Sequence, residues 1–111
     1  MLLSAKIDFG RVLKIKPISK DRFFRVHTKK NNLKRARLGI SLPKNKIKNA
    51  TTRNNLKRKI RNSLQQLSGL SLDIVFVYIN NDEPYDAKIT KKSIEHHKNK
   101  ILYTTEKNWK T

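Results

Sequence analysis

The chain has 111 residues, of which 27 are Lys or Arg and 8 are Asp or Glu, so its formal net charge is +19. With 36% hydrophobic residues, this length suits a single domain, residues 1–111, around a modest core. The absence of cysteine excludes disulfides, thiolate nucleophiles and cysteine zinc sites. A compact chain with this much like charge repels itself and attracts polyanions, so the composition indicates a nucleic-acid partner.

Membrane insertion and secretion are not expected. No segment resembles a secretory leader, and the longest apolar run, residues 72–79, contains Asp73 and is far shorter than the roughly 20 residues of a membrane-spanning helix. We therefore expect a cytoplasmic protein with no membrane partner.

The N-terminal part predicts one helix and then strands. The helix runs from Ser4 or Ala5 to about Lys14 and ends near Pro17. Its apolar positions are Ala5, Phe9, Val12 and Leu13. Residues 15–19 add a short edge strand, because proline cannot donate to an inner ladder.

Two longer strands follow. Residues 22–28 and 35–42 alternate apolar and polar side chains, which predicts strands. The lysine-rich segment 29–34 joins them, so we expect a hairpin.

A basic helix is the most informative segment. It follows a basic loop, residues 43–48, begins with Asn49 as its cap and runs to about Leu67, with Gly69 just beyond its end. At 3.6 residues per turn the apolar positions form one stripe, and the polar positions crowd the adjoining side. The stripe is Leu56, Ile60, Leu64 and Leu67, and the polar side is Asn54, Lys57, Arg58 and Arg61.

The charges on this helix indicate contact with a nucleic acid, RNA or DNA. Five cations lie between Arg53 and Arg61 with no acid among them, and fifteen Lys or Arg but no acid occur between Asp21 and Asp73. A solvated helix gains stability from mixed signs, whereas Lys57 and Arg61, four residues apart, repel each other. Guanidinium and amide groups suit phosphate and 2′-hydroxyl contacts, which favours contact with RNA or DNA over a merely solvated face.

The C-terminal part predicts a buried strand and a last helix. Residues 72–79 are mostly apolar at both odd and even positions, so both faces of a strand here would be apolar. We therefore expect a central strand covered by helices on both faces. After a proline-containing turn over residues 80–86, a helix runs from Lys88 to about Tyr103. Residues 104–111 are expected to be a frayed tail. The inward positions of the helix are Ile94, His97 and Ile101.

The sequence offers no catalytic set, so we expect no catalytic residue and no metal bound by the protein. His27 lies on a predicted strand, and His96 and His97 diverge by about 100° on a helix, which does not suit a metal pair. The three acids within residues 82–86 could gather a divalent ion, but the neighbouring Asn and Pro residues favour a turn.

Most aromatic side chains are needed for the core. Phe76 lies in the buried strand, whereas Phe23 and Phe24 point to opposite faces of one strand, so at least one is expected on an accessible face. Beside Arg22 and Arg25, such a ring could stack a base from a single-stranded nucleic acid.

Three segments are distinctive in order and spacing: Ile7–Leu13, Arg37–Lys44 and Asn49–Arg61. They resemble the first helix, the strand leading into a basic loop and the signature helix of the bacterial ribonuclease P protein family, and the resemblance extends over nearly the whole chain. The family signature reads Arg-Asn-Arg, an aliphatic residue, Lys, Arg, two further positions and Arg. This chain has Asn55 at the third position, where a cation is missing.

The resemblance implies a fold. The expected structure is a two-layer α/β (α+β) sandwich of order α-β-β-β-α-β-α with a four-stranded mixed sheet, as in the ribosomal protein S5 domain 2-like fold. It includes a left-handed crossover around the signature helix, which the usual right-handed rule would not predict.

The resemblance also implies a function, the protein subunit of ribonuclease P. Such a subunit binds a catalytic RNA and the single-stranded 5′ leader of precursor tRNA, and assists endonucleolytic removal of the leader. The RNA cleaves with Mg²⁺, so the implied cofactor is the catalytic RNA. The implied partners are ribonuclease P RNA and precursor tRNA, and DNA is not expected.

Two groups of residues carry this implied function. By position, the catalytic RNA would meet Arg53, Asn54, Lys57, Arg58 and Arg61, and a leader cleft between the first helix and the sheet would be lined by Phe9, Leu13, Phe24, His27 and Lys44. Leu13 stands where the family commonly has an aromatic residue, and His27 where a Tyr can occur.

Two other hypotheses stay open on sequence grounds. A stand-alone RNA- or ribosome-binding module would share the charge and the elements, and would bind structured RNA without dependence on a leader. An autonomous nuclease would need catalytic carboxylates or histidines, which eight acids and three scattered histidines do not assemble.

Overall fold

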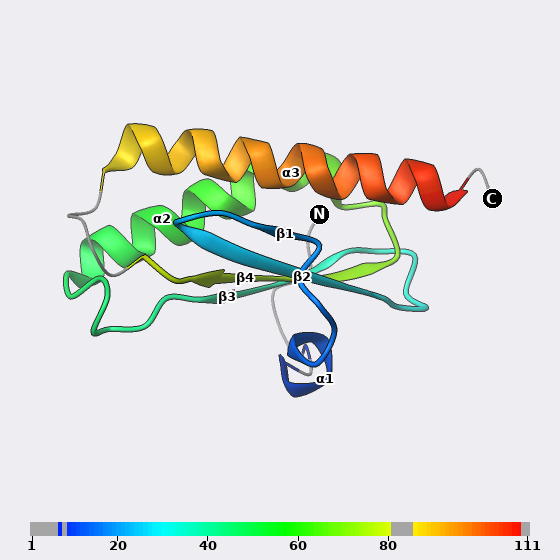
Figure 1. Cartoon of the computed structure of the whole chain (residues 1–111), viewed down its shortest axis with the longest axis horizontal. Coiled ribbons are helices and arrows are strands. Elements are labelled where there is room, and N and C mark those ends of the chain that lie inside the picture. Colours follow the sequence, from blue (N-terminus) through cyan, green and yellow to red (C-terminus); the bar gives the residue numbers. More distant parts are fainter. Residues whose placement is uncertain (1–6, 8, 81–85, 110–111) are drawn as a thin grey trace.

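The structure, a computed structural model, describes residues 7, 9–80 and 86–109. Within this part of the chain, three α-helices and four strands follow one another in the predicted order (Figure 1). They are α1 (Phe9–Leu13), β1 (Ser19–Lys20), β2 (Phe24–Lys30), β3 (Arg37–Ser41), α2 (Ala50–Ser63), a 3₁₀ turn (Gln65–Leu67), β4 (Leu72–Tyr78) and α3 (Ala87–Trp109). The predicted start of the first helix lies outside the described residues.

The four strands form one mixed sheet in the order β1-β2-β4-β3. β2 is antiparallel to β1 and β4, whereas β3 is parallel to β4. The predicted hairpin of β2 and β3 is therefore wrong, because β4 lies between them and Phe76 has Val26 on one side and Ile40 on the other. β4 is apolar on both faces, so the central position removes more apolar surface from water than an edge would. α2 forms the crossover connection from β3 to β4. The left-handedness of this connection stays a prediction.

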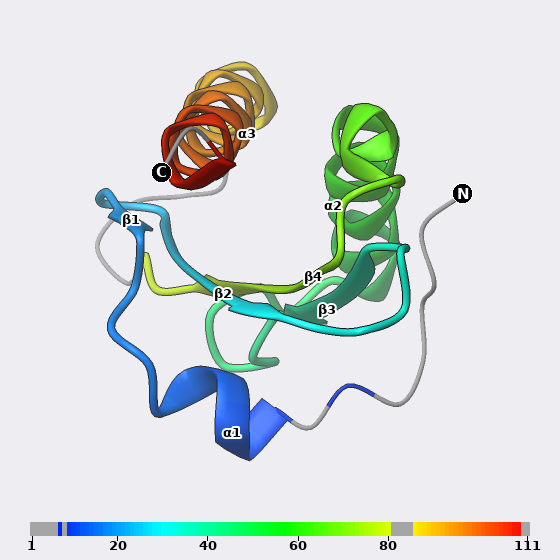
Figure 2. The same cartoon turned by 90° about the vertical axis from the view of Figure 1, so that its right-hand side faces the viewer.

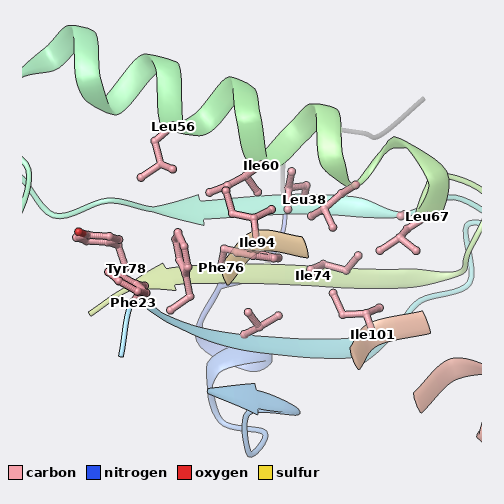
Figure 3. Close-up of a cluster of buried hydrophobic side chains, with 14 of the residues drawn as sticks. Phe23, Leu38, Leu56, Ile60, Leu67, Ile74, Phe76, Tyr78, Ile94 and Ile101 are labelled. Carbon is pink, nitrogen blue, oxygen red and sulfur yellow. The ribbon is translucent and has the colours of Figure 1, made fainter. Parts of the chain in front are cut away.

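Helices cover both faces of the sheet, as the pattern of β4 predicted. α2 and α3 lie on one face, and α1 lies on the other, against β2 and β4 (Figure 2). The main core fills the space between the sheet and the α2–α3 layer, where Ile74 and Phe76 of β4 meet Ile60 and Ile94 of the helices (Figure 3). Val75, between Ile74 and Phe76, is also fully buried and points to the α1 side.

α2 begins where the sequence predicted and ends earlier. The Asn49 side chain accepts a hydrogen bond from the backbone N–H of Thr52 at 3.2 Å, which caps the first turn. The α-helix stops at Ser63, and the 3₁₀ turn carries the chain on to Leu67. Gly69 is not a left-handed cap, because no glycine of the described part has a positive φ.

α3 is longer than the sequence predicted. Asp86 caps it, since one carboxylate oxygen accepts the backbone N–H groups of Lys88 at 2.9 Å and Ile89 at 3.1 Å. The expected frayed tail from residue 104 is wrong as far as Trp109, because the helix continues to that residue and residues 104–109 contain neither Gly nor Pro. The inward positions are confirmed, as Ile94, His97 and Ile101 are fully buried.

Asp21 joins the turn between β1 and β2 to α3. Its Oδ1 accepts the backbone N–H groups of Phe23 and Phe24, both at 2.9 Å, and its Oδ2 accepts the Ser93 hydroxyl at 2.5 Å. Burial raises the pKa of Asp21, but the bonds from Ser93 and the two N–H groups outweigh it and hold this pKa below 3.8.

His97 completes this network from inside the core. Its Nδ1 lies 2.6 Å from the Ser19 hydroxyl oxygen, and its Nε2 lies 3.2 Å from Asp21 Oδ1 without the alignment of a hydrogen bond. Burial lowers the pKa of His97 below 6.5, although Asp21 opposes this shift. His97 is therefore a neutral ring near pH 7, packed edge-on against Phe24 and Phe76 with centroids 6.0 Å away.

Candidate nucleic-acid interface

α2 presents a cationic face to solvent. Its buried side, Leu56 and Ile60, packs on the sheet, and the opposite side exposes Asn54, Lys57 and Arg58. Arg61, on the same side, is partly exposed. α2 contains five cations and no acid, so this surface attracts phosphate along its whole length.

Arg53 has a different role from the other cations of α2. Its Nη1 donates to the carbonyl oxygens of Ile47 at 2.7 Å and Lys48 at 3.0 Å. These bonds tie the end of the basic loop back onto the helix. Arg53 therefore shapes the loop as well as adding charge to this face.

Phe9 is an accessible ring on the α1 side of the sheet. It is 39% exposed, and the tip of its ring approaches Gly39 of β3, where an added Cβ would come within 2.6 Å of the ring. Only glycine at position 39 leaves room for this packing. Leu13, one turn further along α1, is partly exposed beside it.

The prediction that Phe24 faces a leader cleft is wrong. Phe24 is 0% exposed and packs on the α2–α3 side of the sheet. Its ring makes edge-on contacts with the rings of Phe76 and Tyr78, and each pair of ring centroids is 5.5 Å apart. Phe23 is also buried, at 5% exposure, so neither ring of this pair is accessible for stacking. Both aromatic side chains are buried in the core because the chain bends at Arg22 and Phe23, so that β2 begins only at Phe24 and strand alternation does not apply to the pair.

His27 faces the α1 side but is not accessible. It is 3% exposed, and its Nδ1 donates to the Ile15 carbonyl oxygen at 2.7 Å. This bond holds the segment after α1 against β2, so His27 is too buried to line the predicted leader cleft. Its Nε2 has no hydrogen-bond partner in the described part of the chain.

Lys44 is exposed in the loop that follows β3. Phe9 lies over the middle of β3, so the basic loop and the aromatic ring mark two points along the same strand. The structure therefore keeps Phe9, Leu13 and Lys44 as candidates for one surface and removes Phe24 and His27.

A cavity of about 150 Å³ lies at the other end of β3, and sequence reasoning missed it. Arg37 and Asp73 line it and form an ion pair: Arg37 Nε donates to Asp73 Oδ1 at 2.6 Å, and Arg37 Nη2 donates to Asp73 Oδ2 at 2.5 Å. Burial raises the pKa of Asp73, but the bonds from Arg37 and Asn31 outweigh it and lower this pKa below 3.8. The signal was present in the sequence, because a single acid inside the apolar run 72–79 needs a cationic partner.

No protein-based hydrolytic site is assembled in the described part. Ser19, His97 and Asp21 follow one another as in a catalytic triad, but Ser19 is 7% and His97 0% exposed, so no substrate reaches them. The described residues bring no three His, Asp or Glu side chains together as metal ligands. Asp86 caps α3, and the other two acids of the predicted turn lie outside the described residues.

Residues 7, 9–80 and 86–109 include no helix with the length and apolar character required to cross a bilayer.

Known proteins resemble this chain along most of its length. The family model described as Ribonuclease P matches residues 1–105. The ribonuclease P protein component of Streptococcus equi subsp. equi is 35% identical over 91 residues, which cover 80% of this chain and 76% of that protein. The ribonuclease P protein component of Histophilus somni is 37% identical over 83 residues, covering 74% of this chain and 61% of that protein.

Solved structures agree. The Staphylococcus aureus RNase P protein superposes with a TM-score of 0.65 and 26% identity, over 95% of this chain and 96% of that one. The RNase P protein of Thermotoga maritima gives a TM-score of 0.58 and 25% identity, over 87% of each chain. The chain therefore belongs to the ribonuclease P protein family, the protein subunits of a tRNA-processing ribonucleoprotein.

Proposed function

We propose that this chain binds the catalytic RNA of ribonuclease P through α2 and holds the single-stranded 5′ leader of precursor tRNA on the α1 side of the sheet. The RNA, with Mg²⁺, cleaves the leader in the cytoplasm, and the protein raises the affinity for precursor tRNA and lowers the metal demand. The single observation that carries the proposal is the acid-free cationic face of α2, on the far side of the sheet from an accessible Phe ring.

The α2 face suits the backbone of a structured RNA. Asn54, Lys57, Arg58 and Arg61 lie on one side of a helix that is fixed to the core by Leu56 and Ile60. Each phosphate that these side chains neutralise releases counterions, so binding is strong at low salt and weakens as salt rises. Arg53 contributes by holding the loop beside them.

The α1 side suits a single strand. An exposed Phe ring offers a stacking surface for a base, which stabilises binding by about 1–3 kcal/mol per base whatever its sequence. Lys44 lies beyond one end of β3 and provides charge for the backbone that leads to that base. Phe9, Leu13 and Lys44 are thus the proposed leader residues.

The sheet separates the two proposed surfaces, because α2 and α1 cover opposite faces of it (Figure 2). One protein can therefore contact the catalytic RNA and the substrate leader at the same time. This arrangement supports a role in placing substrate on the RNA.

Cleavage of precursor tRNA by a bacterial ribonuclease P RNA at low Mg²⁺ tests the proposal. The protein is expected to stimulate cleavage strongly, and the stimulation is expected to depend on the presence of a leader. Protein without RNA serves as the control and is expected to be inactive.

The alternatives predict different results in the same assay. A stand-alone RNA-binding module would bind structured RNA and leave the cleavage rate unchanged. Cleavage by the protein alone at limiting Mg²⁺, abolished by one acid-to-amide substitution, would indicate an autonomous nuclease.

A further inference from the structure

The outer face of α3 has no role in the function proposed above. α3 runs along the length of the molecule (Figure 1), and five residues of its outer face follow one another at intervals of three or four. They therefore lie in one stripe along the helix, about 21 Å long, which is enough for several nucleotides. This α3 outer stripe consists of Ile89, Lys92, His96, Lys100 and Tyr103, and all five side chains are exposed.

The charge of α3 favours an anionic partner. From Ala87 to Thr105 the sequence contains five lysines, one acid, Glu95, and no arginine. Within the part of the chain that the structure describes, Lys92 and Lys100 form no ion pair, so the protein does not neutralise them. An ammonium group is a compact charge on a flexible stem, which contacts phosphate without the fixed geometry of a guanidinium group. Such contacts hold a polyanion without reading its sequence.

Tyr103 gives the α3 outer stripe a stacking surface. Its side chain is 62% exposed, more than any other large hydrophobic side chain in the described part, and Ile89 at the other end is 45% exposed. Lys100 lies about one turn before Tyr103, so a cation and an open ring are adjacent. Surfaces that bind single-stranded nucleic acid combine these two features, whereas protein interfaces are depleted of lysine. The stripe therefore suits single-stranded RNA better than an acidic protein.

The α3 outer stripe is separate from the cationic face of α2. Glu95 lies on the flank of α3 that faces α2, because it shares a hydrogen bond with Ser63 of α2. The bond from Lys98, at 2.7 Å, is the main reason that the pKa of Glu95 is below its usual value, so a negative charge lies between the two helices. On α2, Arg61 is about 160° around the helix from Ser63, so Arg61 points away from α3. RNA on that flank of α2 leaves the stripe open.

We propose that the α3 outer stripe is a third RNA-binding surface, which holds a single-stranded stretch of RNA other than the leader. The lysines contact its phosphates, and a base stacks on Tyr103. The inference goes beyond the proposed function, because neither the catalytic RNA on α2 nor the leader on the α1 side of the sheet uses this face (Figure 2). A transcript that extends beyond a precursor tRNA is then held at a second point.

Binding of a labelled oligouridylate to the assembled ribonucleoprotein tests the inference. The ribonucleoprotein is first saturated with a non-cleavable precursor tRNA, which occupies the leader surface. Wild type is expected to bind the oligouridylate. Lys92→Gln/Lys100→Gln is expected to bind it more weakly, and the salt slope of the dissociation constant is expected to fall by about 0.7 for each lost phosphate contact.

The matched control is Lys16→Gln/Lys34→Gln, which removes the same charge from two exposed positions outside α2 and α3. This control is expected to keep the wild-type affinity and salt slope. Equal weakening in the two double variants would overturn the inference, because the oligouridylate would then respond to net charge alone. The same comparison with the protein alone gives a result that does not depend on assembly.

Substitutions of Tyr103 test the stacking contact. Tyr103→Phe keeps the ring and is expected to bind the oligouridylate like wild type. Tyr103→Leu keeps an apolar side chain without a flat ring, and its dissociation constant is expected to rise at least about fivefold. Both changes are at an exposed position, so the fold stays intact. Equal affinity of the two variants would overturn the stacking contact and with it the preference for a single strand.

Other occupants of the stripe give different results. Oligouridylate that binds the protein alone but not the ribonucleoprotein would overturn the inference, because the catalytic RNA would then cover the stripe. Polyglutamate that binds more tightly than oligouridylate, and is weakened by Tyr103→Leu, would indicate an acidic protein partner instead. Leader-dependent stimulation of cleavage without oligouridylate binding would overturn only the α3 surface, whereas absence of stimulation would count against the proposed function itself.

Discussion

Two arginines of α2 show how much the role of one side chain depends on its partners. Arg58 is exposed, so its guanidinium is available to RNA. In Arg53, one guanidinium nitrogen donates hydrogen bonds to the carbonyl oxygens of Ile47 and Lys48. The residue type is the same, but only Arg53 contributes to the shape of the free protein.

We expect Arg53→Gln to lower the free energy of unfolding by about 1 kcal/mol, because it removes the charged donor from two carbonyl groups. Amide hydrogen exchange of residues 44–48 should become faster. Arg58→Gln is the matched control and should leave unfolding within about 0.5 kcal/mol of wild type while weakening RNA binding. Equal stability of the two variants would show that the Arg53 bonds do not hold the loop.

His97 makes stability depend on pH. Its pKa in the folded protein is below 6.5, so the unfolded chain takes up a proton first as the pH falls. The stabilisation is complete above pH 6.5 and is lost as the pH falls toward the folded pKa, by at most about 1.4 kcal/mol per pH unit. Urea unfolding between pH 8 and pH 5.5 measures this loss.

The same titration with His97→Gln assigns the effect. The slope below pH 6.5 should become flatter in this variant. His96→Gln removes only the smallest of the influences on the His97 pKa and should therefore keep most of the wild-type slope. If the free energy of unfolding depended on pH in the same way in wild type and in His97→Gln, His97 would not be the cause of the pH dependence.

At the scale of elements, α1 is held to the sheet by a close approach. A methyl group at position 39 would come within 2.6 Å of the Phe9 ring, and the ring tip rather than a backbone atom would have to move. Phe9 is 39% exposed, so the ring can turn outward. A substitution at this glycine therefore changes the accessible surface more than it changes the core.

Gly39→Ala is accordingly expected to lower the free energy of unfolding by only about 1 kcal/mol, at the low end for added core volume. It should weaken binding of precursor tRNA with a leader and leave the affinity for the catalytic RNA unchanged. Thermal unfolding and the two dissociation constants provide the measurement. A similar loss for mature tRNA would argue against a leader surface around Phe9.

The elements differ in how far the sequence predicts them. α2 was predictable because its cap at Asn49 and its buried positions Leu56 and Ile60 depend on neighbouring residues only. The strand that pairs with β2 was not predictable in this way, because the partner is the unusually apolar β4, which lies far away in the sequence. Phe24 was misplaced for a related reason: strand alternation says that two neighbours face opposite ways, but not which face the helices cover.

The whole molecule has two surfaces that the sheet keeps apart. Arg58 lies on the α2 side of the sheet and Phe9 on the α1 side. Energetic effects of substitutions at such separated sites usually add. The molecule should therefore behave as two independent binding surfaces joined by a rigid core.

Arg58→Ala is expected to weaken assembly with the catalytic RNA and to reduce its salt slope by about one. Phe9→Ala should weaken the binding of precursor tRNA more than the binding of mature tRNA. In the double variant, the free-energy losses should add within about 0.5 kcal/mol when both affinities are measured with the ribonucleoprotein. A larger coupling would mean that the two surfaces communicate through the sheet.

The central place of β4 also determines when the protein can fold during its synthesis. Until residues 72–78 leave the ribosome, β2 has only the two-residue β1 beside it, and β3 has no neighbour among the described strands. Two paired strands are at best marginally stable in water. A nascent chain that ends before Leu72 already contains every cation of α2, yet it has no sheet for α2 to pack on, so we expect it to stay unfolded and to be digested by protease as readily as a denatured chain.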